Sequence, residues 1–226
     1  MNALTLALCR IALAALLLLG AMPVRAIPIL VFSTYNETTQ ELRTLISANG
    51  LTPTSGATIG AFDFNFHYDP TLLRLEQVNF RSLLGSPDKS AFRSDGDKLV
   101  VSMSGSGQAL SYASLTTGVS NALRLASASL LEAGAGTCTF CTGPYLNELQ
   151  GSVVPLVSLT FHSLVVLPNI HPQTLGYEMA RFTVSDGQGN PYLYTPVQFS
   201  PVPLPPTLAL FGIGLFGLLR WRPARA

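Results

Sequence analysis

The chain has 226 residues, of which 48% are hydrophobic and only 11% charged, less than half of the roughly 25% charged residues of typical soluble domains. The formal net charge is +1, but five of the 13 Lys and Arg lie near the two ends, whereas all 12 Asp and Glu lie in the body. A body near −4 excludes the basic footprint of a nucleic-acid-binding protein. Its length is sufficient for one domain with its own core.

The first 26 residues predict a secretory signal peptide. Arg10 supplies positive charge, and the unbroken apolar run at residues 11–19 has the length of a signal segment but is too short to span a bilayer. Pro23 breaks the helix, and Val24 and Ala26 occupy the −3 and −1 positions of a cleavage site. We therefore predict export, with cleavage after Ala26.

The first element of the body is predicted to be a short helix at residues 38–50. Thr38 and Glu41 have the spacing of a capping box, and Gly50 is a typical residue just after a helix end. Between them lies an apolar stripe at helical spacing, formed by Leu42, Leu45 and Ile46.

Residues 61–68 alternate strictly between two faces, which predicts a strand with one buried and one wet side. The buried side is predicted to carry Phe62, Phe64, Phe66 and Tyr68. The wet side is predicted to carry Asp63, Asn65 and His67.

Further short runs predict more strands, separated by clusters of Gly, Ser, Asn and Pro. In the next run, Leu73, Leu75 and Gln77 alternate with Arg74, Glu76 and Val78. The other candidate strands are residues 98–103, 123–130, 153–166, 181–185 and 192–199. Many short strands with such turns predict a mostly β protein, a sandwich or a barrel.

Residues 60–73 resemble the cohesin-like β-sandwich family. In that family a strand ending in Tyr or Phe-Asp-Pro is followed by a second strand, and here Tyr68, Asp69 and Pro70 stand at that point. The resemblance extends over roughly residues 56–199, whereas residues 27–55 depart from the usual opening strand. It implies an antiparallel β-sandwich at residues 27–199 that binds a protein partner and has no catalytic activity.

Cys138 and Cys141 are the two cysteines that remain once the leader with Cys9 is removed. An even pair in an oxidising compartment predicts a disulfide. The flanking Gly, Thr and Pro residues indicate a loop rather than the helix N-terminus of a redox Cys-x-x-Cys motif. Redox activity and free or metal-bound thiols are the alternatives.

Catalytic, cofactor and metal sites are not predicted. The alternative is an exported glycan-active enzyme that uses scattered carboxylates such as Asp63, Asp69 and Glu76, which would have to lie together in a cleft. Oxygen-rich segments at residues 95–97 and 186–190 are either hairpin turns or calcium ligands, and turn chemistry is the more ordinary reading. His67 and His162 are predicted to be solvated strand residues; His171 is isolated from both in sequence.

The last 27 residues form a tripartite tail. Residues 200–206 are a stiff Pro-rich linker, and residues 207–219 are uncharged and rise about 20 Å as a helix, less than the roughly 30 Å of a bilayer core. Cations and Trp221 follow this helix, which places the tail tip on the cytoplasmic side. The cations of this retention segment are Arg220, Arg222 and Arg225.

This tail resembles the PEP-CTERM sorting signal in its Val-Pro-Leu-Pro variant. The motif is formed by Val202, Pro203, Leu204 and Pro205, followed by the hydrophobic helix and Arg-rich end at residues 207–226. The resemblance implies an exosortase as processing partner and a transient membrane tether in a Gram-negative bacterium. We therefore expect a surface or extracellular-matrix protein that binds a protein or an exopolysaccharide; a plain tail-anchored membrane protein is the alternative.

Overall fold

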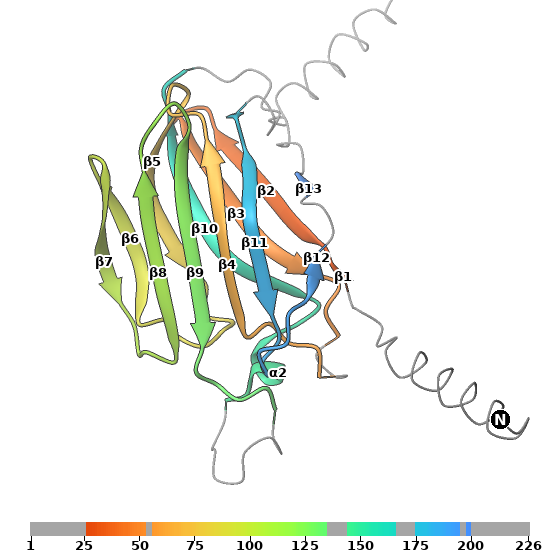
Figure 1. The fold of residues 1–226 in the computed structure, drawn as a ribbon. Coiled ribbons are helices and arrows are strands. Elements are labelled where there is room, and N and C mark those ends of the chain that lie inside the picture. The colour runs from red at the N-terminus through yellow and green to blue at the C-terminus, as the bar shows by residue number, and fades with distance from the viewer. Residues whose placement is uncertain (1–25, 53–55, 135–143, 166–174, 195–197, 200–226) are drawn as a thin grey trace, which may run out of the picture.

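The structure is a computed structural model that describes residues 26–52, 56–134, 144–165, 175–194 and 198–199. Within these ranges the chain forms short strands, mostly antiparallel, and one four-residue helix (Figure 1). The strands are β1 (Ala26–Ile27), β2 (Ile29–Asn36), β3 (Glu41–Asn49), β4 (Ala61–Tyr68), β5 (Leu73–Phe80), β6 (Lys89–Asp95), β7 (Lys98–Ser104), β8 (Ala109–Thr116), β9 (Asn121–Ser129), β10 (Val153–Ser163), β11 (Glu178–Ser185), β12 (Leu193–Tyr194) and β13 (Gln198–Phe199). The helix is α2 (Leu146–Leu149).

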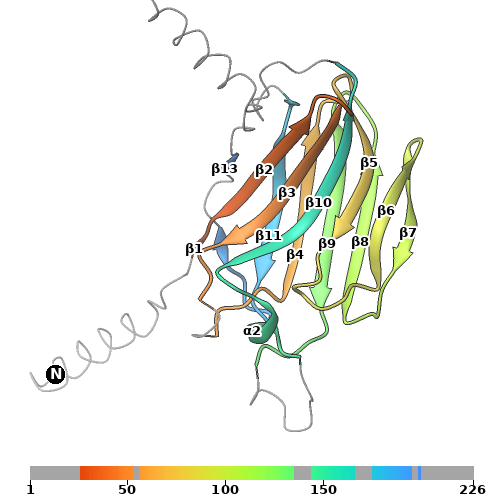
Figure 2. The ribbon, with the colours of Figure 1, turned by 180° about the vertical axis from the view of Figure 1, so that it is seen from behind.

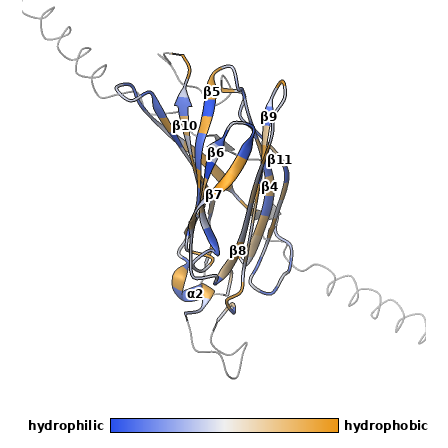
Figure 3. Cartoon of the chain, turned by 90° about the vertical axis from the view of Figure 1, so that its left-hand side faces the viewer, coloured by the Kyte–Doolittle hydropathy of each residue, from blue (hydrophilic) through white to orange (hydrophobic). Residues whose placement is uncertain are grey.

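Two sheets pack face to face and enclose the core (Figure 3). The larger sheet has seven strands in the order β13-β2-β3-β10-β5-β6-β7, and the smaller has four in the order β11-β4-β9-β8. All neighbours in these sheets are antiparallel except β13 and β2; β1 and β12 form a separate parallel pair. The predicted mostly β, antiparallel sandwich with one short helix is therefore confirmed.

Strand β4 matches the predicted alternation. Phe64 and Phe66 are fully buried, whereas Asp63, Asn65 and His67 lie half-exposed on the outer face of the four-stranded sheet. The core is rich in aromatic contacts that link the two sheets, including a 6.3 Å centroid separation between Phe62 and Phe80 of β5. Burial of one side of β4 therefore contributes directly to the sheet-on-sheet packing.

The helix predicted at residues 38–50 is wrong, because Glu41–Asn49 forms strand β3. Asn36 Oδ1 accepts hydrogen bonds from the Thr38 and Thr39 amides, at 3.0 and 3.4 Å, and thereby stabilises a hairpin turn instead of a helix start. The strand pairs with β2 on one side and β10 on the other. The one helix of the described residues lies elsewhere, at α2, where Glu148 accepts a hydrogen bond from the Tyr145 amide.

The physical reason is that β3 also carries a period of two. Leu42, Thr44, Ile46 and Ala48 are all buried, whereas Leu45, a member of the predicted helical stripe, is only half-buried. Pairing with β2 and β10 gives the backbone of β3 hydrogen-bond partners on both sides. This tertiary gain outweighs the weak local preference for a helix.

Strand β5 differs from its predicted phase after Leu75. Thr160 pairs with Gln77 and Phe161 pairs with Leu75, so Glu76 is an extra residue in a β-bulge. The bulge turns Val78 into the core, whereas Gln77 lies on the outer face. The prediction that Gln77 shares a face with Leu75 is therefore wrong.

The remaining strand predictions agree in position, with differences at the ends. Residues 98–103 and 123–130 coincide with β7 and β9 to within a residue or two, and residues 181–185 lie inside β11. The strand predicted at residues 153–166 begins where β10 begins, but β10 ends at Ser163. Of the predicted strand at residues 192–199, the structure describes residues 192–194 and 198–199, which contain the short strands β12 and β13. Strands β2, β6 and β8 are additional to the sequence prediction.

Several predictions fall outside the described residues: the leader before Ala26, the pair Cys138 and Cys141, His171, the sorting motif and the Arg-rich tail. Ala26 itself lies in β1. None of the helices in the described ranges combines the length and the apolar character that crossing a membrane requires.

Candidate binding surface

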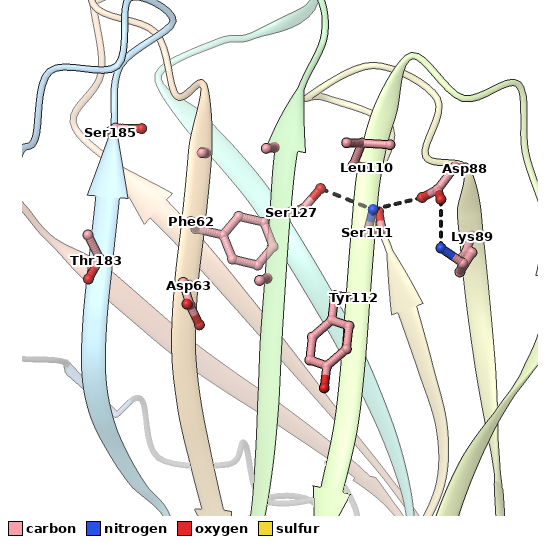
Figure 4. A pocket seen from close by; sticks show the side chains of 13 residues that line it. Phe62, Asp63, Asp88, Lys89, Leu110, Ser111, Tyr112, Ser127, Thr183 and Ser185 are labelled. Atoms are coloured by element: carbon pink, nitrogen blue, oxygen red, sulfur yellow. Dashed lines mark hydrogen bonds and ion pairs between the residues drawn. The ribbon is translucent and has the colours of Figure 1, made fainter.

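A shallow groove of about 470 Å³ lies on the outer face of the four-stranded sheet (Figure 4). We call it the Tyr112 groove. It crosses all four strands, β11, β4, β9 and β8, and reaches Asp88 and Lys89 at the start of β6.

The hollow arises from side-chain size in two cross-strand rows. The first row runs Ser185, Ala61, Ala128 and Leu110, in the order of strands β11, β4, β9 and β8. The second row runs Thr183, Asp63, Ala126 and Tyr112. Small alanines on β9 thus form a floor, and Leu110 and Tyr112 form a higher wall on β8.

The wall is unusually apolar for a sheet face in water. Leu110 and Tyr112 are each 53% exposed. The Tyr112 hydroxyl makes no hydrogen bond to another side chain or backbone group within the described part of the chain. Tyrosine at such a position offers both apolar area and a hydrogen-bonding tip, the combination that is enriched at protein interfaces.

Charges at the groove are already paired. Arg124 of β9 makes two hydrogen bonds to the Asp63 carboxylate, at 3.2 and 2.7 Å. The pair is exposed to solvent and so contributes little to stability. It neutralises the carboxylate in the groove, which leaves a surface of low net charge.

Asp88 closes one end of the groove. Its Oδ1 accepts a hydrogen bond from the Ser111 amide at 2.7 Å, its Oδ2 accepts one from Lys89 Nζ at 2.8 Å, and its own amide donates to the Ala109 carbonyl at 2.7 Å. Burial alone would raise the pKa of Asp88, but the hydrogen bonds that its carboxylate accepts from Lys89 and Ser111, together with the Lys89 charge, hold that pKa below its usual range. The ionised form therefore holds the connection before β6 against the edge of β8.

The carboxylates considered for catalysis do not come together. Asp63 lies on the outer face of the four-stranded sheet, and Glu76 lies on the outer face of the opposite sheet. Asp69 lies beyond the end of β4, where its Oδ1 accepts hydrogen bonds from the amide and hydroxyl of Thr71, at 2.8 and 2.6 Å. A glycosidase needs two such groups across one cleft.

The two oxygen-rich segments are hairpin turns. Asp95 pairs with Lys98 across a turn in which Gly96 has a φ of +60°. Asp186 accepts hydrogen bonds from the amides of Gln188 and Asn190 and from the Asn190 side chain, so three of the contacts of its carboxylate stay within its own turn. Among the described residues, no group of three or more His, Cys, Asp and Glu is placed to hold a metal ion.

The predicted solvated histidines lie apart. His67 is on the outer face of β4, and His162 is on the outer face of β10 in the opposite sheet; both are half-exposed. The residues that form the groove wall were not singled out in the sequence. A signal for them exists in the alternation of Leu110 and Tyr112 with Ser111 and Ala113, but the small inward side chains made the strand hard to recognise.

No family model and no curated protein matches the chain. Cohesins are among the similar solved structures. A type II cohesin A11 from Bacteroides cellulosolvens is 12% identical with a TM-score of 0.49, over 79% of this chain and 99% of that one. A cohesin OlpA–Doc918 complex from Clostridium thermocellum is 10% identical with a TM-score of 0.45, over 80% and 100%. A non-cellulosomal cohesin from Archaeoglobus fulgidus is 10% identical with a TM-score of 0.43, over 83% and 98%.

These scores all lie below 0.5 and the identities below 25%. Because similarity at this level carries no argument about a binding site, the sandwich fold is described from the strand pairing of this chain, and the groove from the side chains that line it.

Proposed function

We propose that residues 27–199 form a non-catalytic binding module that holds a protein partner in the Tyr112 groove. The observation that carries this proposal is the half-exposed pair Leu110 and Tyr112 beside an alanine floor. Apolar and aromatic side chains at the centre of an interface supply most of its binding energy.

The surroundings of the pair favour a protein over a sugar polymer in this groove. Its lining is predominantly apolar, and its one carboxylate at the centre, Asp63, is already neutralised by Arg124. Hydroxyl groups of Thr183 and Ser185 along the opposite wall offer hydrogen bonds at a polar rim. The similar structure of the cohesin OlpA is a complex with the dockerin Doc918, which is a protein partner. The proposal for this chain rests on the groove itself.

Export and sorting are part of the same proposal. The apolar leader with its cleavage site after Ala26 supports export, and the Val-Pro-Leu-Pro tail supports processing by an exosortase. Ile27, the first residue after the predicted cut, is buried at the edge of the core, which supports a body that begins close to this point. Export also favours a disulfide between Cys138 and Cys141.

The binding proposal is tested by site-specific photo-crosslinking in the native host. A photoreactive amino acid replaces Tyr112 in one variant and, as the matched control, Thr34 on the outer face of the opposite sheet. We expect discrete adducts with one protein from position 112 and none from position 34. The protein recovered in the adduct then serves as the ligand for measurements with purified components.

In those measurements, Tyr112→Ala should weaken binding at least tenfold, because truncation of a central aromatic residue costs about 2 kcal/mol. The melting temperature should stay within about 2 °C, since the side chain is exposed. Equal adducts from both positions, or unchanged affinity of Tyr112→Ala, would show that the groove is not the binding surface.

A further inference from the structure

A second groove, of about 560 Å³, lies on the outer face of the seven-stranded sheet. It crosses β10, β5, β6 and β7 of this sheet, whereas the Tyr112 groove crosses the other sheet. Figures 1 and 2 show these two sheets on opposite sides of the sandwich. We call it the Arg93 groove. Its lining is polar and apolar in nearly equal measure, in contrast to the apolar Tyr112 groove.

Strand register places three polar side chains in one row across this groove. Thr160 of β10 pairs with Gln77 of β5, and Gln77 pairs with Arg93 of β6. Neighbouring strands lie about 4.8 Å apart, so the row presents a hydroxyl, an amide and a guanidinium at regular intervals. Gln77 donates one hydrogen bond to Asn79 at 3.0 Å and keeps its carbonyl oxygen for a further partner.

Arg93 is the exposed cation of this row. Its guanidinium makes no hydrogen bond or ion pair with any residue in the described part of the chain. Its five N–H groups have a geometry that allows two of them to donate hydrogen bonds to the two oxygens of one carboxylate. The other arginine of the groove, Arg74, contacts Glu76 at 3.3 Å, so the groove carries a net charge of one positive unit within an acidic body.

The β-bulge described above creates this arrangement. Because Glu76 is the extra residue in β5, Gln77 moves to the outer face between Thr160 and Arg93. Without the bulge, Gln77 would point into the core.

We propose that the Arg93 groove binds a polysaccharide that carries carboxylate groups, that is, a polymer of acidic sugars. The Arg93 guanidinium donates hydrogen bonds to a carboxylate, while Gln77 and Thr160 form hydrogen bonds with sugar hydroxyl groups. The row continues beyond the groove to Arg43 of β3, which pairs with Thr160 and lies three strand spacings, about 14 Å, from Arg93. Arg43 is ion-paired with Glu41, as Arg74 is with Glu76, so Arg93 is the cation of this row that has no ion pair within the described residues. The row therefore offers a polymer one unpaired cation and a line of polar groups.

An acidic peptide is the competing ligand, and the groove fits it less well. Acidic peptide motifs are recognised by clusters of arginines, and extended peptides by strand addition at a sheet edge. This groove lies on a sheet face and has, within the described residues, one arginine without an ion pair. Sugars, in contrast, present hydroxyl groups in every residue and bind through hydrogen bonds to planar polar side chains.

The test uses the full chain, kept in a neutral detergent, in affinity electrophoresis with polygalacturonate. Dextran is the neutral polymer and poly-glutamate the peptide. We expect retardation by polygalacturonate that weakens as salt is added, and none by dextran. Arg93→Ala should weaken binding at least tenfold, because it removes charge-assisted hydrogen bonds to the carboxylate. Arg93→Gln provides a second variant of similar size.

Two further variants make the test specific. Glu76→Gln should strengthen binding about threefold to tenfold, because it removes the anion of the groove and releases Arg74. Arg81→Ala, which removes an exposed arginine beyond the end of β5, should leave binding unchanged. Tyr112→Ala should also have no effect, so this proposal stands or fails independently of the protein-binding proposal.

The proposal is overturned by any of three results. The first is that polygalacturonate does not retard the wild-type protein. The second is that Arg93→Ala and Arg81→Ala bind polygalacturonate equally well. The third is that poly-glutamate binds as tightly as polygalacturonate, which would identify an acidic protein segment as the ligand instead.

Discussion

Phe64 is completely buried and lies between two other aromatic rings. Its centroid is 5.4 Å from that of Phe62 and 5.3 Å from that of Phe182 on the neighbouring strand β11. These stacked contacts add to the apolar area that each ring removes from water. Asn65, the next residue, lies on the outer face of the same strand.

Replacement of Phe64 by Ala should reduce the free energy of unfolding by about 3–5 kcal/mol, because the cavity between two rings cannot close fully. Asn65→Ala is the matched control and should change it by less than about 0.5 kcal/mol. Urea denaturation of both variants provides the measurement. Similar midpoints for the two variants would contradict the assignment of the buried face.

At the scale of an element, the start of β4 depends on close backbone contact. The Gly60 amide donates to the Ser185 carbonyl at 2.8 Å, and its carbonyl accepts from the Ser129 amide at 2.7 Å. A Cβ atom at this position would lie 2.2 Å from the carbonyl oxygen of Asp186. Gly60 therefore allows β4 to enter the sheet between β9 and the turn that follows β11.

Gly60→Ala should destabilise the protein by about 3 kcal/mol, because the clash is with backbone, which cannot move aside as a flexible side chain can. Gly151 is the matched control: a Cβ atom there meets nothing within 4 Å. Gly151→Ala should be neutral or stabilise by about 0.5 kcal/mol, through the entropy of the unfolded chain. Thermal melts would contradict the assignment if Gly60→Ala melted at or above the temperature of Gly151→Ala.

At the scale of the whole molecule, both ends of the described body lie at one edge of the sandwich. The described body begins at β1, directly before β2, and ends at β13, which pairs with β2 at the edge of the seven-stranded sheet (Figure 1). Strand β7 forms the opposite edge. The grooves occupy the two outer faces, so a tether at the β2 edge is compatible with binding on either face.

If the tail is a sorting signal, mature protein from the native host should lack it. Peptides that contain Trp221 should be absent from the surface fraction, as mapped by mass spectrometry. Replacement of Pro203 and Pro205 by Ala should block processing, so that these peptides appear at full stoichiometry. Neutral residues in place of the tail arginines should weaken retention before processing. The arginines concerned are Arg220, Arg222 and Arg225.

Trp221 peptides at full stoichiometry in the wild-type surface fraction would identify the tail as a permanent anchor. The sorting proposal would then fail, whereas the two binding proposals would be unaffected.

The fold class could be predicted because a strand with one buried side alternates every second residue. Strand β4 has this pattern without interruption, and its ends and faces were predicted correctly. In β3 the same burial coexists with helix-like capping and spacing signals, and only pairing with β2 and β10 decides between them. Strand β8 escaped prediction because its inward residues Ala109, Ser111 and Ala113 are small or polar.

The sequence by itself determined the strand-rich body, because alternation of apolar and polar residues is a local pattern. The leader and the sorting tail are likewise predicted from local patterns of polarity and proline, and they stay predictions. The grooves were decided only by the tertiary structure. Ala61, Ala128 and Leu110 are far apart in the chain and become one surface through register, and Gln77 reaches the row with Arg93 through a bulge opposite β10. Register is set by long-range pairing and core packing, which no local pattern specifies.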